Sequence, residues 1–394
     1  MNYDELLSPA AKQMRPSGIR KFFDLAADMP HCISLGVGEP DFKTPWSVRD
    51  AGIRSLEQGR TKYTANAGLK ELRAEVCNYL ARRFELNYEP QNVLVTVGGS
   101  EAIDLAIRAL VKPGDEVIIP EPCFVCYEPI TQLVGGVPVH IATRAEDEFR
   151  LTAEQLKAAI TPRTKLLIFP YPNNPTGAVM SAADMLTIAE VLRDTNIMVL
   201  SDEIYSELTY GLDRHVSFAS LPGMAERTIV VNGFSKSYAM TGWRIGYAAA
   251  NAEIAKAMSN YLSHSTGSPC SISQQAALAA FGESQEPSYE MKKAFDERRK
   301  YFYERVQNIP GVSCLMPEGA FYIFMNIKEL LGKTIKGIKI NNSNDFASAF
   351  LEKGLVAVVP GSAFGADGYV RWSYATSMEN IKEGLDRLEK FLAD

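Results

Sequence analysis

Two cations stand eight residues apart in the stretch N-G-F-S-K-S-Y-A-M-T-G-W-R-I-G-Y (232–247), which contains no acidic residue. They are Lys236 and Arg244. One interpretation is that both decorate the surface. The other is a site in which Lys236 supplies a nucleophilic amine beside an anion that the chain does not itself provide. A lysine forms a Schiff base with an aldehyde most readily where partial burial makes its deprotonation easier.

Further polar residues come directly after short apolar runs that have the composition of buried strands. In an open sheet of parallel strands, ligands bind beyond the carboxyl ends of the strands, so we expect these polar residues to lie near one another. Four runs show the pattern: V-L-V-T-V (93–97) before Gly98, Gly99 and Ser100, K-L-L-I-F (165–169) before P-Y-P-N-N-P-T-G (170–177), I-M-V-L-S (197–201) before Asp202 and Tyr205, and T-I-V-V-N (228–232) before Lys236.

The elements that must position these residues follow from an alternation of apolar runs and amphipathic stretches. Continuous β-branched runs that alternate with helical patterns predict an α/β fold, with a mostly parallel, seven-stranded sheet between helices. Beyond residue 285 a long charged helix leads into a smaller α+β unit. We predict three parts: 1–47 as an N-terminal segment (an arm and part of the small domain), 48–285 as the large domain, and 286–394 as the small C-terminal domain.

Composition and charge exclude several function classes. The 394 residues carry a formal net charge of -6, and their Lys and Arg residues are scattered, so we predict no nucleic-acid partner and no membrane partner. No apolar stretch approaches the roughly 20 residues of a membrane helix. The start, M-N-Y-D-E-L-L-S-P, has acids where a secretory signal would be basic and then apolar, so a cytoplasmic location is predicted.

Cysteine and histidine spacing gives no sign of a metal site. The only short-spaced pair, Cys123 and Cys126, forms a C-x-x-C without a second Cys or His pair to complete a ligand set. Two buried or loop thiols are therefore favoured over zinc or redox chemistry, and no metal is predicted.

The residue types at the strand ends match the needs of one cofactor. A group that is both an aldehyde and a phosphate ester would explain Lys236 together with Arg244. An anionic Asp202 would keep a pyridine nitrogen protonated, so that the ring could accept electrons from a substrate's α-carbon. These properties describe pyridoxal 5'-phosphate (PLP).

The chain resembles the class I/II aminotransferases of PLP fold type I, the aspartate aminotransferase superfamily. The resemblance runs from G-V-G-E-P-D-F (36–42) to V-R-W-S-Y-A-T (370–376). It is carried by the signature S-K-x-Y-A-M-T-G-W-R-I-G-Y, together with P-N-N-P-T-G and S-D-E-I-Y. It implies fold type I, PLP, a ping-pong transfer of an amino group from an L-amino acid to a 2-oxo acid, and a homodimer with shared active sites.

The resemblance also implies a role for each matching residue. Lys236 would hold PLP as a Schiff base and then move a proton between the substrate's α-carbon and the cofactor, with Asp202 and Tyr205 as further catalytic residues. Tyr205 and Asn174 would bind the ring's 3-oxygen. The implied cofactor-binding set is Tyr63 (toward the neighbouring subunit's phosphate), Gly99, Ser100, Phe124 (stacked on the ring), Asn174, Asp202, Tyr205, Lys236 and Arg244, and the implied substrate-binding set is Gly38, Asn174 and Arg371, which would grip the α-carboxylate.

The substrate is less sharply implied than the reaction. Ser100 stands where some relatives place a lysine that binds a distal carboxylate, so aspartate specificity does not follow. Ser17 and Ile19, in R-P-S-G-I-R (15–20), would favour an apolar or aromatic side chain. The family alone motivates 2-oxoglutarate as acceptor. Trp243, Phe321 and Tyr322 are expected either to line the pocket or to pack in the core.

Two other readings of the same residues stay open. A fold-type-I carbon–sulfur β-lyase would keep every cofactor residue but eliminate a β-substituent. A non-enzymatic PLP-binding regulator would carry an appended DNA-binding domain, and the region before Gly36 is too short and not basic enough for one. We therefore expect an aminotransferase.

Overall fold

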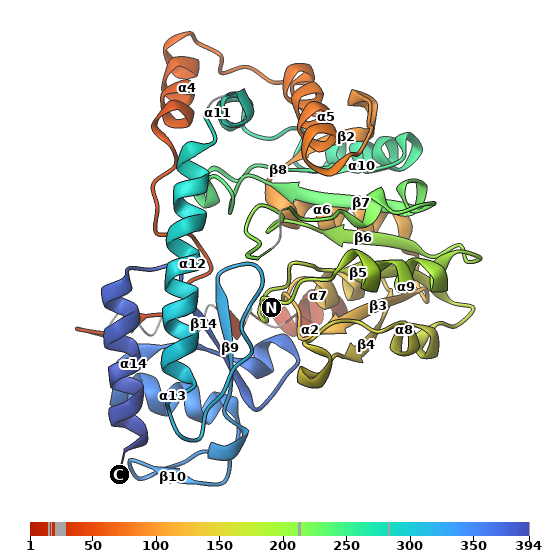
Figure 1. Cartoon of the computed structure of the whole chain (residues 1–394). Helices are drawn as coiled ribbons and strands as arrows, with labels where there is room; N and C mark the ends of the chain where they lie inside the picture. The colour runs from red at the N-terminus through yellow and green to blue at the C-terminus, as the bar shows by residue number, and fades with distance from the viewer. Residues whose placement is uncertain (15, 17, 20–28, 212–213, 283, 394) are drawn as a thin grey trace.

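The computed structural model describes residues 1–14, 16, 18–19, 29–211, 214–282 and 284–393 (Figure 1). Its largest element is a seven-stranded sheet in the order β2-β8-β7-β6-β5-β3-β4. Only β8 runs antiparallel to its neighbours, so the predicted mostly parallel, seven-stranded sheet is confirmed. The strands are β2 (Val93–Thr96), β3 (Glu116–Glu121), β4 (Val137–Ala142), β5 (Thr164–Phe169), β6 (Met198–Asp202), β7 (Thr228–Gly233) and β8 (Gly246–Ala249).

Helices cover both faces of this sheet because alternate strand residues point to opposite sides. Val117 and Ile119 pack with one group of helices, and Ile118 between them packs with the other. The first face carries α6 (Gly98–Leu110), α7 (Tyr127–Leu133) and α10 (Ala252–His264). The second face carries α5 (Lys70–Phe84), α8 (Ala153–Ala159), α9 (Ala182–Leu192) and α11 (Ser271–Gly282). Outside these layers lie α1 (Tyr3–Leu6), α2 (Pro9–Gln13) and α4 (Trp46–Glu57).

A second, smaller sheet has the antiparallel order β13-β14-β9. The long helix α12 (Glu286–Val306) runs from beside α11 down to this sheet (Figure 1). The remaining elements are β9 (Tyr322–Asn326), β10 (Thr334–Ile335), β11 (Ile338–Lys339), α13 (Ser343–Gly354), β12 (Val356–Ala357), β13 (Val359–Pro360), β14 (Tyr369–Ser373) and α14 (Met378–Leu392).

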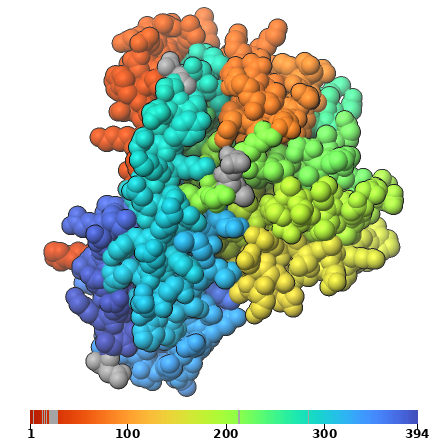
Figure 2. Space-filling model, in the orientation of Figure 1, coloured from red at the N-terminus to blue at the C-terminus, as the bar shows by residue number. Residues whose placement is uncertain are grey.

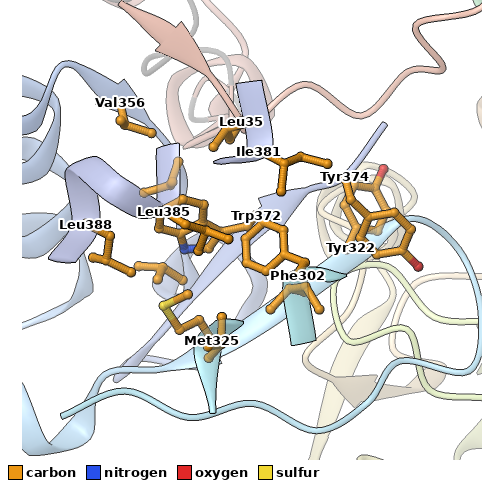
Figure 3. Close-up of a cluster of buried hydrophobic side chains, with 14 of the residues drawn as sticks. Leu35, Phe302, Tyr322, Met325, Val356, Trp372, Tyr374, Ile381, Leu385 and Leu388 are labelled. Atoms are coloured by element: carbon orange, nitrogen blue, oxygen red, sulfur yellow. The ribbon is translucent and has the colours of Figure 1, made fainter. Parts of the chain in front are cut away.

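The core of this smaller unit includes a residue from the start of the chain. Leu35 packs with Phe302 of α12, Trp372 of β14 and Leu385 of α14 (Figure 3). The adjacent β1 (Ile33–Ser34) pairs in parallel with β12. The N-terminal segment is therefore tied to the C-terminal core just before it reaches Gly36, where the G-V-G-E-P-D-F motif begins.

Two further observations concern membranes and thiols. None of the described helices combines the length and the apolar character that crossing a membrane requires.

Cys123 is buried and Cys126 half-buried, and both are free thiols. Burial raises the pKa of both thiols, which is the behaviour of packed rather than reactive cysteines.

Candidate active site

A cavity of about 400 Å³ lies at the carboxyl ends of β3, β5, β6 and β7, where residues of β9 and β14 also reach it. The sequence predicted this convergence of strand ends. Every predicted site residue except Tyr63 lines the cavity: Gly38, Gly99, Ser100, Phe124, Asn174, Asp202, Tyr205, Lys236, Arg244 and Arg371.

Lys236 follows β7 and presents its amine to the cavity. Nζ donates a hydrogen bond to the carbonyl oxygen of Gly38 at 2.5 Å, and it lies 5.9 Å from the ring centroid of Tyr205 and 5.7 Å from that of Phe321. Burial, and after it the Arg371 guanidinium, lower the pKa of Lys236 to about 8. An amine with this pKa is partly deprotonated near neutral pH, so it can act as a nucleophile and as a base.

Asp202 is the last residue of β6 and is buried. Its Oδ2 accepts a hydrogen bond from the Tyr127 hydroxyl at 2.7 Å, and its Oδ1 accepts one from the Ile204 N–H at 3.3 Å. Burial raises the pKa of the Asp202 carboxyl, and the Tyr127 hydrogen bond opposes that rise. Among the described residues no side-chain cation lies within 4 Å of it. A buried carboxylate in this setting suits a ligand that brings its own positive charge.

Arg371, on β14, is a buried guanidinium that forms no ion pair with a described acidic residue. One terminal nitrogen donates to Asn174 Oδ1 at 2.8 Å, and the other donates to the Gly36 carbonyl at 2.6 Å. The centroid of the Tyr322 ring lies 4.3 Å from the central carbon of the Arg371 guanidinium, and Arg371 Nε has no hydrogen-bond partner among the described residues. Burial lowers the pKa of Arg371. A fork held in this way is prepared to bind a carboxylate.

The G-V-G-E-P-D-F segment crosses the cavity under close steric control. A Cβ on Gly38 would lie 2.7 Å from the Tyr322 hydroxyl oxygen, so this position has room only for glycine. The Tyr322 hydroxyl is itself 2.9 Å from that of Tyr205. At the other end of the segment, Arg298 of α12 donates to both Asp41 oxygens at 2.8 and 3.0 Å. The Gly38 carbonyl that meets Lys236 is therefore fixed from two sides.

The corner of the cavity at the start of α6 is built for an anion. Gly98 has φ +76°, and a Cβ there would lie 2.8 Å from a terminal nitrogen of Arg244. Gly246 of β8 allows the helix to approach, since a Cβ on it would lie 2.8 Å from the Gly99 nitrogen. Arg244 is exposed and forms no ion pair with a described acid. A helix N-terminus beside an unpaired guanidinium is a favourable place for a phosphate.

For the remaining residues that the sequence singled out, the structure gives positions but does not test the predicted roles. Tyr63 is fully exposed, away from the cavity, and Phe124 is half-buried at its wall. Ser17 lies outside the described residues, whereas Ile19 lines the cavity. Trp243 does not line it, and its Nε1 donates to the Thr44 hydroxyl at 3.0 Å.

Sequence reasoning missed two contributions to the cavity. Tyr127, the first residue of α7, bonds Asp202, and no local sequence pattern indicates that contact. Glu39 also lines the cavity, where its Oε2 accepts a hydrogen bond from the Thr241 hydroxyl at 2.9 Å. Neither residue directly follows an apolar run, which is the pattern that indicated Asp202 and Lys236, and the family resemblance assigned neither of them a role.

Comparison with known proteins covers nearly the whole chain. Residues 30–388 match the family model for aminotransferase class I and II. An aspartate aminotransferase of Geobacillus stearothermophilus is 45% identical over 361 residues, 91% of each chain. Aromatic-amino-acid aminotransferase 2 of Thermococcus litoralis is 39% identical over 393 residues, 98% of each chain. The crystal structure of an aspartate aminotransferase from Rhizobium meliloti superposes with a TM-score of 0.94 at 41% identity, covering 98% of each chain.

Proposed function

Because the chain belongs to the class I and II aminotransferases, a family that uses PLP, we propose that it transfers the amino group of an L-amino acid to 2-oxoglutarate in a ping-pong cycle. One observation carries the proposal. A lysine whose pKa is lowered to about 8 shares a cavity with a buried guanidinium and a buried carboxylate that form no ion pairs with described residues.

The described residues fit PLP. Arg244 and the first turn of α6 offer a guanidinium and backbone N–H groups to a phosphate, and Gly98 leaves the room that a Cβ would fill. Asp202 offers its carboxylate to a protonated ring nitrogen, while Phe124 offers an aromatic face at the wall. When bound, PLP supplies an aldehyde that takes up the amino group and a ring that accepts electrons from the α-carbon.

The catalytic work of the chain itself centres on Lys236. Its amine is the proposed attachment point for the cofactor, and once released it takes the α-proton of the substrate as a general base. Asp202, oriented by the Tyr127 hydroxyl, would offer its carboxylate to the protonated ring nitrogen. Tyr205 and Asn174 are the proposed partners of the ring's 3-oxygen.

Substrate orientation falls to Arg371. We assign it the α-carboxylate that donor and acceptor share, because its guanidinium is already aligned by Asn174 and by the Gly36 carbonyl. Gly38 keeps the space beside that guanidinium free, because a Cβ on it would lie only 3.9 Å from a terminal nitrogen of Arg371. A fixed fork orients the substrate without a further loss of conformational freedom on binding.

The donor class is not set by the relatives, because their names include both aspartate and aromatic amino acids as substrates. Three basic side chains line the described cavity, namely Lys236, Arg244 and Arg371, and each has a proposed partner already. A distal carboxylate would need a further cation. 2-Oxoglutarate carries a distal carboxylate as well, so that cation has to come from outside the described lining, and the lining alone does not distinguish a neutral from an acidic amino donor.

We further propose a homodimer with shared active sites. Tyr63 is fully exposed and outside the cavity of its own chain, as a residue that serves a neighbouring subunit would be. The cytoplasmic location stays a prediction from the sequence.

Product stoichiometry tests the proposal. The purified enzyme would be incubated with PLP, a donor such as L-phenylalanine and 2-oxoglutarate, and both products quantified. We expect one glutamate for each phenylpyruvate. For the β-lyase alternative, an S-alkylcysteine supplied without an acceptor would give continuous pyruvate and ammonia, and that result would replace the aminotransferase assignment.

A further inference from the structure

A second cavity, of about 260 Å³, lies outside the site described above. Its walls come from α5, the end of α11 and the beginning of α12, together with the chain that follows β6 and β7. Figure 2 shows the cyan of α12 beside the orange of α5, with green residues between them. The aminotransferase reaction assigns no role to this cavity.

The polar lining of this cavity carries a cation without a close acidic partner. Glu207 accepts two hydrogen bonds from Arg83, at 2.9 and 2.6 Å, and a third from the Tyr79 hydroxyl at 2.6 Å. Burial opposes ionisation of Glu207, but these hydrogen bonds outweigh it and its pKa lies below the usual value. Arg82 pairs with Glu75 outside the cavity.

Lys292 is the basic side chain of the described lining that forms no ion pair. It is half-buried on α12, and no carboxylate of the described residues lies within 4 Å of its ammonium. Burial lowers the pKa of Lys292. A bound anion would restore the stabilisation that the ammonium loses on leaving water.

The apolar lining is aromatic. Tyr79 and Phe281 stack with ring centroids 4.5 Å apart, and Tyr238 meets Phe281 edge-on at 6.1 Å. Tyr289 stands at the mouth with 53% of its surface exposed. Such a wall favours a flat, apolar ligand body.

We propose that this cavity binds a small aromatic monocarboxylate. Lys292 forms no ion pair with a described residue, and the more distant carboxylates of Glu207 and Asp296 offset its charge only in part, so it favours one anionic group on the ligand. The Tyr79–Phe281 stack offers a surface for a ring, and the volume limits the ligand to about one ring with a short side chain. The ligand would also touch Ser237, which directly follows Lys236, and Leu208, three residues after Tyr205. An occupant would therefore contact both segments that carry the candidate active site.

Fluorine NMR with 4-fluorophenylacetate as the probe tests this proposal on the PLP-loaded enzyme. A carboxylate can also bind at Arg371, so two bound resonances are expected, and Arg371→Leu identifies the one from the active site. Lys292→Met removes the charge but keeps the side-chain stem. We expect this change to weaken binding at the second site about tenfold, the scale of one charge-assisted hydrogen bond.

The neighbouring Lys293→Met is the matched control, because Lys293 is exposed on the same helix and does not line the cavity. It should bind the probe as the wild type does. Equal affinities of the Lys292→Met and Lys293→Met enzymes, or a single resonance that disappears with Arg371→Leu, would overturn the proposal. If Arg371→Leu does not fold, the comparison of the two lysine variants still decides it.

Competition with acetate measures how much the aromatic ring contributes to binding apart from the carboxylate charge. Acetate should displace the probe from the second site at least about tenfold less well than unlabelled phenylacetate, because it cannot use the aromatic wall. Equal displacement by the two acids would overturn the aromatic part of the assignment.

Discussion

The buried floor of the candidate active site and its exposed rim differ in how much of their chemistry the chain itself completes. On the floor, Lys236, Asp202 and Arg371 are each held by hydrogen bonds from or to the protein. On the rim, Arg244 is exposed, and Tyr63, which lies outside the cavity of its own chain, is exposed as well. The floor is set by this fold, whereas in our proposal the phosphate of the cofactor and a second subunit complete the rim.

The physical basis of the difference is desolvation. Burial is the first cause of the lowered pKa of Lys236 and of the raised pKa of Asp202. Water at the rim screens charges, so each contact there contributes less. Changes on the floor should therefore affect catalysis, and changes on the rim should affect cofactor retention.

Lys236→Ala should have the largest effect. With the attachment point and the general base both removed, kcat should fall by at least about 10³-fold. Steady-state kinetics measures this, and circular dichroism should show an unchanged fold. Turnover within about tenfold of the wild-type rate would remove Lys236 from the centre of the mechanism.

Arg371→Leu comes next, because it deletes the α-carboxylate fork from the floor. We expect kcat/KM to fall about 100-fold for every amino donor, mostly through KM. Arg371→Lys should fall between the two enzymes, since it keeps the charge but loses the fork. A loss confined to one donor would point to side-chain recognition instead.

Arg244→Ala tests the rim. The dissociation constant of PLP should rise about 20-fold, measured by fluorescence during dialysis, while kcat at saturating PLP changes less than about threefold. If kcat at saturating PLP fell as far as in Lys236→Ala, the distinction between floor and rim would not hold.

The titration of Lys236 gives the smallest expected effect. It tests whether burial on the floor of the site lowers the pKa of this lysine. The amine attacks the PLP aldehyde only when deprotonated, so the rate of PLP uptake by cofactor-free enzyme should rise with pH through about 8. Between pH 7 and pH 9 we expect a rise of about tenfold followed by a plateau. An ordinary lysine, with a pKa near 10.4, would instead give a rise approaching 100-fold over that interval and no plateau.

Much of the site could be predicted from sequence because its residues follow strands of strong apolar pattern. The run 198–202 forms β6 and ends on Asp202, and the run 228–233 forms β7 shortly before Lys236. In a parallel sheet these ends must meet at one edge. Residues reached by this rule needed no tertiary information.

The remainder depends on contacts between distant segments. Arg298 fixes Asp41 from 257 residues away, and Tyr127 reaches Asp202 from a helix on one face of the sheet. Gly246 matters because α6 approaches it closely, and no local pattern records that approach. Sequence periodicity identifies elements, but it cannot show which side chains meet across them.

The central claim is that the Lys236 site takes the amino group from an amino acid before any acceptor arrives. The most direct measurement is the absorption spectrum of the PLP-loaded enzyme after single amino acids are added without acceptor. The account predicts that the visible band bleaches with a subset of donors and returns when 2-oxoglutarate is added. A band that persists while ammonia and keto acid accumulate would contradict it.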